Sequence, residues 1–537
     1  MLLISMSQES NLHYLRSFGS AFVASEPWVK FGINQQTNMW PVADLVFSHM
    51  SLLLVLTSES SPDENHHCTA STFMSIWDVL NPKTPIATLN GVKSLTCACF
   101  APNNSFVVAA GTLTGALALW DLREIGTPET AARDVAYTTN CLTCESESYQ
   151  PIHSSAILNL CPMADPFASI RGNATFQLVS IDDRGLVAVW LVVESAVDNV
   201  SLFQSTVDLR STNHGSVSHM DESLVGLRVG SNLRLTCSRS LAIWSSVPVF
   251  FSPYYDAYCT TERDATDARL LGRTLLGSDQ DGSSVNPGIG FDSYLTEVGV
   301  GPGVSAFAIS PSNSNEFVVG LSDSHIVKCS RIGLAKSPRI FLSSSDMMHG
   351  SIAGECDTLA FEKQSSSQSQ TAGSRATHLS FSPFDSELFL VGQLDGGCRL
   401  YRLDRSTPLL SWPVITPRYC EDRPAGHCLA LDATVSDLKW SPQRPSVFFL
   451  LHTNGNLHTF DLNKDDARPV HSCKLERDAK SPISTLPPKL AISLRNNMLA
   501  ISFHGTVFTR SLSTLNQEEQ NSEIKTLRTK LSATSTT

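Results

Sequence analysis

The sequence predicts an all-β fold, a closed ring of seven small sheets, because one spacing recurs along the chain. A proline precedes a hairpin-turn residue by 13 positions in four places: Pro102 and Gly115, Pro311 and Ser324, Pro383 and Gly396, Pro442 and Gly455. Five positions later each copy reaches a strand-closing residue: Trp120, Cys329, Tyr401 and Phe460. Equal spacing at distant places indicates one supersecondary unit used repeatedly. Small sheets repeated in this way form a β-propeller.

Each copy of the unit predicts three strands. The first ends in a Ser-Pro or Ala-Pro turn, because proline fixes φ and cannot donate to a sheet. The second is a short apolar run such as 389–391, which is typical of a strand buried on both faces. A turn such as Asp395-Gly396 then tolerates the positive φ of a tight hairpin. The third strand, as in 116–120, places one face inward and one outward.

Three weaker copies complete the set. The segments 72–77, 185–190 and 505–510 keep the five-residue step, although the last has lost its aromatic residue. In the first two, the inter-strand loops have grown by the polar insertions 58–68 and 162–173. Four clear copies and three weaker ones make seven, a number of sheets that closes a propeller.

The ends of the chain have separate expected roles. Because a closed ring needs its ends to meet, we expect Ser20–Lys30 to pair beside the last blade. The segment 516–530 is polar, with Leu527 and Leu531 as sparse apolar points, and predicts either a short helix or a frayed tail. The expected organisation is an N-terminal segment (1–40), the propeller (41–513) and a polar C-terminal tail (514–537).

Two long insertions interrupt the ring. The segment 195–296 separates two copies by far more than one repeat, although it contains a strand-like piece at 241–244. The segment 343–374 is polar and includes the string SSSQSQ, whose low hydrophobicity cannot offset the entropy of ordering.

Composition excludes several classes of protein. Hydrophobic residues make up 42% of the 537 residues, and the formal net charge of −12 argues against a general nucleic-acid binder, which needs a basic face. No apolar run approaches the roughly 20 residues that span a bilayer, so no membrane association is expected. The opening residues make a poor signal peptide. The 14 scattered cysteines agree with a reducing cytoplasm, where no disulfide frame is needed.

The sequence offers no catalytic or cofactor-binding residues. It contains neither a G-x-S-x-G elbow nor a G-x-x-x-x-G-K-[ST] phosphate loop, and the glycine-rich run 299–303 does not open a βαβ unit. The carboxylates of Asp182, Asp183 and Asp395 are explained by their places in hairpin turns. The Trp-Asp pairs at 77–78 and 120–121 are expected to be packing and strand-end residues.

One cysteine pair has the spacing of half a zinc site. Cys141 and Cys144 form a C-x-x-C pair, with His153 and Cys161 downstream, and thiolates at this spacing suit tetrahedral zinc. The second half of the site lacks a matching pair, so we expect exposed or core thiols and no metal. The triplet His66-His67-Cys68 in an insertion is interpreted in the same way, as solvated.

Several strings resemble a known family. SIWDV, ALALWDLRE and LVAVWLVVE look like the ends of WD repeats. FSPFDSELFLVGQLDGGCRLYRL and WSPQRPSVFFLLHTNGNLHTFDL resemble the dynein intermediate-chain subset of that family. GTLTGALALWDLRE, VWLVVE and PLLSW look like the intermediate chains of cytoplasmic dynein 2. The resemblance covers roughly residues 40–513, and it makes the expected fold a seven-bladed WD-repeat β-propeller with long loop insertions.

The resemblance implies a role in a motor complex. Such chains are non-catalytic subunits of the motor that drives retrograde intraflagellar transport, in the cytoplasm, the cytoskeleton and the cilium. The implied partners are the dynein heavy chain, whose helical tail the propeller holds, and a second intermediate chain. Light chains bind a long segment before the propeller in this family. This chain begins almost at the propeller, so that role is either truncated here or lost.

An alternative function stays open from sequence alone. A WD-repeat propeller also serves as a substrate receptor of a ubiquitin ligase or as the hub of another assembly. Propeller faces are built from inter-strand loops, where a partner could dock through an aromatic or arginine anchor. The loop residues Arg184, Arg402 and Arg444 are candidates for such contacts. An ordinary solvated surface is the favoured interpretation for each, so the partner-binding residues stay unknown.

Overall fold

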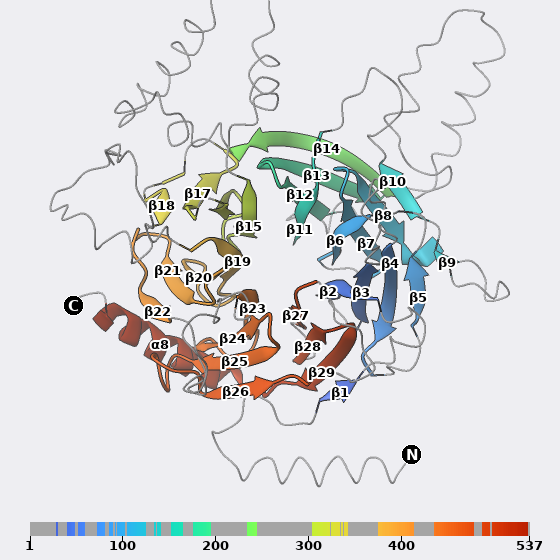
Figure 1. The fold of residues 1–537 in the computed structure, drawn as a ribbon. Helices are drawn as coiled ribbons and strands as arrows, with labels where there is room; N and C mark the ends of the chain where they lie inside the picture. The colour runs from blue at the N-terminus through green and yellow to red at the C-terminus, as the bar shows by residue number, and fades with distance from the viewer. Residues whose placement is uncertain are drawn as a thin grey trace, which may run out of the picture.

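The computed structural model describes the strands of a ring and one C-terminal helix (Figure 1). The described residues are 28–30, 40–48, 52–58, 72–80, 85–89, 92–124 with short gaps, 134–140 with one gap, 152–164, 176–194, 233–243, 303–341 with short gaps, 374–412, 434–476, 486–493 and 497–534. Everything below refers to these residues. The pair Cys141 and Cys144 and the triplet 66–68 lie outside them, as does nearly all of the insertion 343–374.

Seven small sheets stand around a central axis, which confirms the predicted seven-bladed β-propeller (Figure 1). We number the blades along the chain. Blade 1 contains β2 (Val42–Phe47), β3 (Leu52–Ser58), β4 (Thr72–Asp78) and β5 (Ala87–Leu89), and blade 2 contains β6 (Leu95–Phe100), β7 (Val107–Thr112), β8 (Leu117–Asp121) and β10 (Tyr137–Asn140). Blade 3 contains β11 (Ile157–Ala164), β12 (Phe176–Asp182), β13 (Leu186–Glu194) and β14 (Leu233–Ala242). Blade 4 contains β15 (Val304–Ile309), β16 (Glu316–Leu321), β17 (Ile326–Ser330) and β18 (Ile340–Phe341).

Blades 5 and 6 follow the same order, from the innermost to the outermost strand. They contain β19 (Ala376–Phe381), β20 (Leu388–Gln393), β21 (Cys398–Arg402) and β22 (Leu410–Trp412); and β23 (Val435–Trp440), β24 (Val447–His452), β25 (Asn456–Asp461) and β26 (His471–Lys474). Blade 7 contains β27 (Lys489–Ile492), β28 (Met498–Phe503) and β29 (Thr506–Ser511), with β1 (Val29–Lys30) as its outer strand.

The repeat spacing has a direct structural counterpart in the core. The strand-closing aromatics stack on the second strand of the same blade: Tyr401 on Phe389 with ring centroids 5.5 Å apart, and Phe460 on Phe448 at 4.7 Å. Trp120, Tyr401 and Phe460 are all fully buried. Burial of such large rings stabilises the packing of the blade core.

The predicted turn positions share one backbone conformation. Gly115, Gly396 and Gly455 have φ of 87°, 87° and 81°, and Ser324 takes the same place with φ of 79°. Glycine adopts this conformation freely, whereas the Cβ of Ser324 makes it sterically costly. The 13-residue spacing therefore ends at a position that demands positive φ.

The ring closes through a strand from the beginning of the chain. Val29 pairs with Thr509 and Lys30 with Phe508, so β1 is antiparallel to β29. Trp28 packs edge-on against Phe508, with ring centroids 6.4 Å apart. A segment that precedes blade 1 thus supplies the fourth strand of blade 7.

Two outer strands were not evident in the sequence. β9 (Asp134–Val135) lies between the third and fourth strands of blade 2 in sequence but pairs in parallel with β5, as a fifth strand of blade 1. β14 falls inside the predicted insertion 195–296 and pairs with β13 along nine residues. The strand-like piece expected at 241–244 is only the end of β14. Its earlier part alternates the buried Leu233 and Leu235 with charged or polar residues such as Arg234 and Thr236.

The last described element is α8 (Gln517–Thr534), an 18-residue helix. The Asn516 side chain accepts from the amide of Glu519 (2.9 Å), and the Glu519 carboxylate accepts from the amide of Asn516 (3.0 Å), which is a capping box. Of the two alternatives predicted for this tail, the structure shows the helix. Among the described residues, no helix has both the length and the apolar character needed to cross a bilayer.

Candidate interaction surface

The ring has two faces that differ in their loops. Because the strands of a blade alternate in direction, the loops between first and second strands lie on the same face as those between third and fourth strands. We call this the helix face, since α8 packs against its loops 382–387 and 441–446. The opposite face carries the second-to-third-strand turns, such as those at Gly115 and Gly396, and we call it the hairpin face.

The helix α8 packs against the helix face at blades 5 and 6 (Figure 1). Its Leu527 and Leu531, 3% and 7% exposed, belong to the same apolar cluster as Trp440, Phe448 and Leu462. An isolated helix of this length and polarity is marginal in water, so tertiary packing stabilises it.

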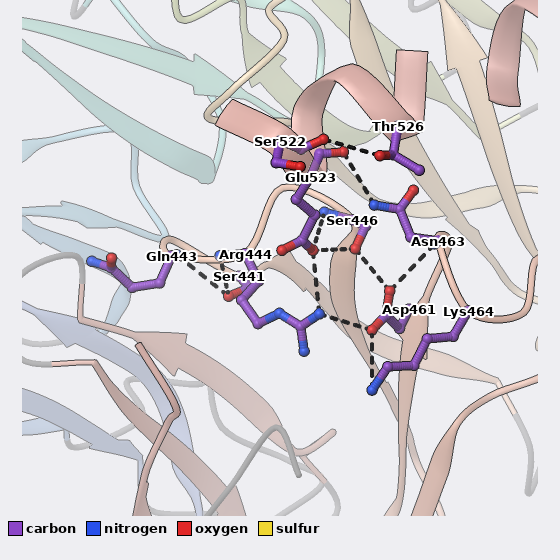
Figure 2. A network of polar contacts seen from close by, with 10 residues as sticks. All are labelled: Ser441, Gln443, Arg444, Ser446, Asp461, Asn463, Lys464, Ser522, Glu523 and Thr526. Atoms are coloured by element: carbon purple, nitrogen blue, oxygen red, sulfur yellow. Dashed lines mark hydrogen bonds and ion pairs between the residues drawn. The ribbon is translucent and has the colours of Figure 1, made fainter. Parts of the chain in front are cut away.

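A polar network joins the middle of α8 to blade 6 (Figure 2). Arg444 Nη2 donates to Asp461 Oδ2 (2.9 Å) and to Glu523 Oε1 (3.3 Å). The backbone amide of Ser446 also donates to Glu523 Oε1 (3.3 Å), and the Ser446 hydroxyl contacts both carboxylates. The side chains of Asp461, Glu523 and Arg444 are 0%, 9% and 15% exposed. Two nearly buried carboxylates therefore share one guanidinium, and removing it would leave both without their closest positive charge.

Further polar contacts follow α8 toward its C-terminus. Lys530 Nζ donates to the carbonyl of Leu462 (2.9 Å) and lies 3.4 Å from Asp466 Oδ2. Arg528 Nε donates to Asp385 Oδ2 (3.2 Å) in blade 5. The helix is thus held by side chains from two blades.

A groove of about 660 Å³ opens between the last turns of α8 and blade 5. Arg402 lines it and donates from Nε (3.1 Å) and Nη2 (2.7 Å) to Glu387 Oε2. The hydrogen bond to Glu387 is the main cause that raises the pKa of Arg402. Because Arg528 and Leu531 form the other wall, the groove exists only while α8 is docked.

The structure separates the three arginines proposed from the sequence. Arg184 is exposed in a turn of the hairpin face, whereas Arg402 lies on the helix face beside the groove. Arg444 is 15% exposed and is bonded to Asp461 and Glu523, so the favoured interpretation of an ordinary solvated residue was wrong for it. Its partner Glu523 lies 79 positions later, and no local signal in the sequence connects the two.

Two of the three predicted turn carboxylates, those of Asp182 and Asp395, accept hydrogen bonds within their own hairpin turns. Asp182 Oδ1 accepts from the backbone amides of Leu186 (2.7 Å) and Arg184 (3.2 Å), which closes the turn after β12. Asp395 Oδ1 accepts in the same way from the amide of Gly397 (2.8 Å). One carboxylate oxygen of each residue is therefore used by the hairpin that holds it.

Sequence reasoning missed a buried chain of hydrogen bonds in blade 3. His153 Nδ1 lies 3.1 Å from Asp182 Oδ2, and its Nε2 lies 2.6 Å from Ser180 Oγ. Trp190 Nε1 donates to Ser180 Oγ (2.7 Å). Because the Asp182 carboxylate can only accept, an imidazole ring with one proton carries it on Nδ1, and His153 Nε2 then accepts from the Ser180 hydroxyl. The available signal was the clustering of Ser180, Asp182 and Trp190 along one hairpin.

This chain of bonds bears on the zinc hypothesis. Both ring nitrogens of the fully buried His153 are already engaged, so it offers no lone pair to a metal. Burial raises the pKa of Cys161 to about 12, which keeps the thiol protonated. Within the described part of the chain, no group of three or more His, Cys, Asp or Glu side chains could hold a metal ion.

Polar side chains also tie the innermost strands of neighbouring blades. Asp44 Oδ2 accepts from the amide of Ala98 (3.0 Å), which joins blade 1 to blade 2. Asp437 Oδ2 accepts from the amide of Leu490 (2.9 Å), which joins blade 6 to blade 7. Burial alone would raise the pKa of Asp437, but Lys439 and other nearby positive charges hold it below its usual value. These contacts make the ring a rigid base for its two faces.

Comparison with known proteins relates the sequence of this chain to dynein intermediate chains. No family model matches the chain. The chain is similar to cytoplasmic dynein 2 intermediate chain 1 of Mus musculus, with 25% identity over 435 residues, 78% of this chain and 32% of the relative. The Homo sapiens protein of that name is 23% identical over 414 residues, 74% of this chain and 30% of the relative. Cytoplasmic dynein 2 intermediate chain 2 of Mus musculus is 23% identical over 428 residues, 79% of this chain and 57% of the relative.

Each match covers most of this chain but a smaller share of the related protein. The chain spans about a third of the length of the two intermediate chain 1 relatives. The repeats predicted a resemblance to dynein intermediate chains, and the matches confirm it. The chain is a seven-bladed propeller protein similar in sequence to the dynein 2 intermediate chains over about three quarters of its length.

Proposed function

We propose that this chain is a non-catalytic intermediate chain of a dynein 2 motor, which scaffolds the heavy chain for retrograde intraflagellar transport in cilia. The observation that carries the proposal is the similarity to two dynein 2 intermediate chains over more than three quarters of the chain. The proposed partners are the dynein heavy chain and a second intermediate chain. ATP hydrolysis would belong to the heavy chain.

The surface supports such a role through its shape. A rigid ring offers two broad faces, and the helix face adds a groove beside α8 with Arg402 on its wall. An arginine already held by a carboxylate is a pre-ordered anchor of the kind that dominates protein interfaces. We therefore expect the heavy chain to dock on the helix face.

Affinity capture of the tagged full chain from ciliated cells, followed by mass spectrometry, tests the proposal. Recovery of the dynein 2 heavy chain and a second intermediate chain is the expected result. Recovery of cullin-type adaptors without any dynein would overturn it in favour of a ubiquitin-ligase receptor. Depletion of the chain should also shorten cilia or swell their tips.

A matched pair of variants then tests the face. Arg402→Glu, on the helix face, should reduce heavy-chain recovery at least tenfold. Arg184→Glu makes the same change on the hairpin face and should leave recovery unchanged. Loss with Arg184→Glu alone would place the heavy chain on the opposite face.

A further inference from the structure

The surface beneath α8 has the properties of a binding site for a helix. We call it the α8 seat: Arg444, Ser446, Leu462 and Asp466 with the apolar cluster around Phe448. Leu527 and Leu531 insert into this cluster. Among the described residues of α8, they are the only two that are fully buried apolar side chains. The seat therefore recognises few side chains, and it does so at defined positions.

The seat distinguishes charge as well as apolar character. At one end, Arg444 and the amide and hydroxyl of Ser446 surround the carboxylate of Glu523. At the other end, the carbonyl of Leu462 and the carboxylate of Asp466 receive the ammonium group of Lys530. The stripe that fits is Glu, Leu four residues later, Lys seven later and Leu eight later. This spacing lies on one face of any α-helix.

Contacts within blade 6 hold the Arg444 end of the seat. Arg444 keeps its 2.9 Å bond to Asp461, and Asp461 is also held by the amide of Asn463 (3.3 Å) and by Lys464 at 3.7 Å. All of these groups belong to blade 6 and its loops, and the strands of this blade pair with one another and not with the tail. A site that is already ordered binds its ligand with less entropic cost.

The helix α8 occupies this site as a ligand that is tethered to the ring. Five residues, 512–516, separate the end of β29 from α8. A short tether gives a bound segment an effective concentration in the millimolar range, so a helix of modest intrinsic affinity can stay docked.

We propose that the α8 seat is a helix-binding site that accepts an amphipathic helix of a partner protein in place of α8. The partner helix would carry the stripe Glu-x3-Leu-x2-Lys-Leu, and its binding and the docking of α8 would exclude each other. This inference concerns what α8 covers and does not depend on which complex the ring joins.

The test uses the full chain and a fluorescent peptide of residues 513–537 as the probe. In wild type the seat is occupied, so peptide binding measured by fluorescence anisotropy should be weak. The double variant Leu527→Asp and Leu531→Asp releases α8, and it should bind the peptide at least tenfold more tightly. Equal binding by the two chains, with the variant still folded, would overturn the proposal.

Peptide variants test the chemistry of recognition. Glu523→Gln removes the charge that Arg444 and Ser446 contact, and it should weaken binding about tenfold, as expected for loss of charged hydrogen bonds. Glu518→Gln makes the same change at an exposed position and should alter binding less than twofold. Equal effects of the two changes would contradict a specific carboxylate position.

A second measurement covers the case in which the double variant does not fold. In the full chain carrying Glu523→Gln alone, hydrogen exchange of the α8 amides should quicken about tenfold while β20 and β24 keep wild-type rates. Glu518→Gln should match wild type. Exchange of α8 that is no faster in Glu523→Gln than in Glu518→Gln would overturn the proposal. A stable wild-type dimer that the peptide dissociates would assign the seat to a second copy and overturn the partner assignment.

Discussion

The hydrogen bonds that stabilise the two faces of the ring span very different distances along the chain. On the hairpin face, the Gly396 amide donates to the carbonyl of Gln393 (3.0 Å), and each such turn is closed by its own neighbours. On the helix face, Arg444 reaches Glu523, 79 positions away. The hairpin face is therefore a property of each repeat, whereas the helix face depends on a segment that follows all of the repeats.

The largest expected loss of stability comes from removing an arginine on the helix face. Arg444→Ala leaves the nearly buried carboxylates of Asp461 and Glu523 without their shared partner, so the free energy of unfolding should fall by about 3 to 5 kcal/mol. Chemical denaturation measures this loss.

A matched arginine provides the control. The ion pair between Arg402 and Glu387 is about half exposed on both sides, and Arg402→Ala should cost less than about 1 kcal/mol. Similar losses for the two variants would show that the network beneath α8 is not a buried one.

The next effect tests the hairpin face. Gly455 has φ of 81°, and a Cβ there would meet Cζ of Phe503, the nearest atom, at 2.6 Å. Gly455→Ala should therefore cost about 2 kcal/mol, from backbone strain and overpacking. In a double-mutant cycle with Phe503→Leu, the combined loss should be smaller than the sum. Strict additivity would show that the ring contact plays no part.

Acid should weaken the hairpin side of blade 6. Burial and the neighbouring His452 lower the pKa of His458 to about 4, from an ordinary 6.5. The folded state thus binds fewer protons than the unfolded state between these values, so stability falls as pH drops from 6.5 toward 4. At pH 5 the loss from His458 should be about 1 to 2 kcal/mol.

The histidine prediction is measured by urea unfolding at pH 7 and pH 5. His458→Gln has no titrating ring, so the difference between the two pH values should shrink by that amount. An unchanged difference would mean that the pKa of His458 is the same in the folded and unfolded states.

The smallest effect is a gain. Ser324 holds φ of 79° at a position where the other clear copies have glycine. Ser324→Gly should relieve this strain, and the net gain after the greater flexibility of unfolded glycine should be about 0.5 kcal/mol. A rise in Tm of a few degrees or less is the expected readout, and a fall would indicate that the serine side chain stabilises its turn.

The same contrast explains what the sequence could predict. Trp120, Tyr401 and the turn at Gly396 were found because their signals lie within about 20 residues of one another and recur. The site beneath α8 was not found, because nothing near Arg444 indicates a carboxylate at 523. The bonds of His153 cross 27 and 29 positions, and β9 pairs with a different blade from its sequence neighbours. Long-range polar pairing leaves no periodic trace in a single sequence.

The two-residue pairing of β1 with β29 has a mechanical consequence. Traction on the chain ahead of Val29 would load this short ladder in shear, together with the contact between Trp28 and Phe508. The same strand β29 leads within six residues to α8. Force applied before Val29 and release of α8 would therefore both act on β29. This strand is where tension on the chain would first reach the ring.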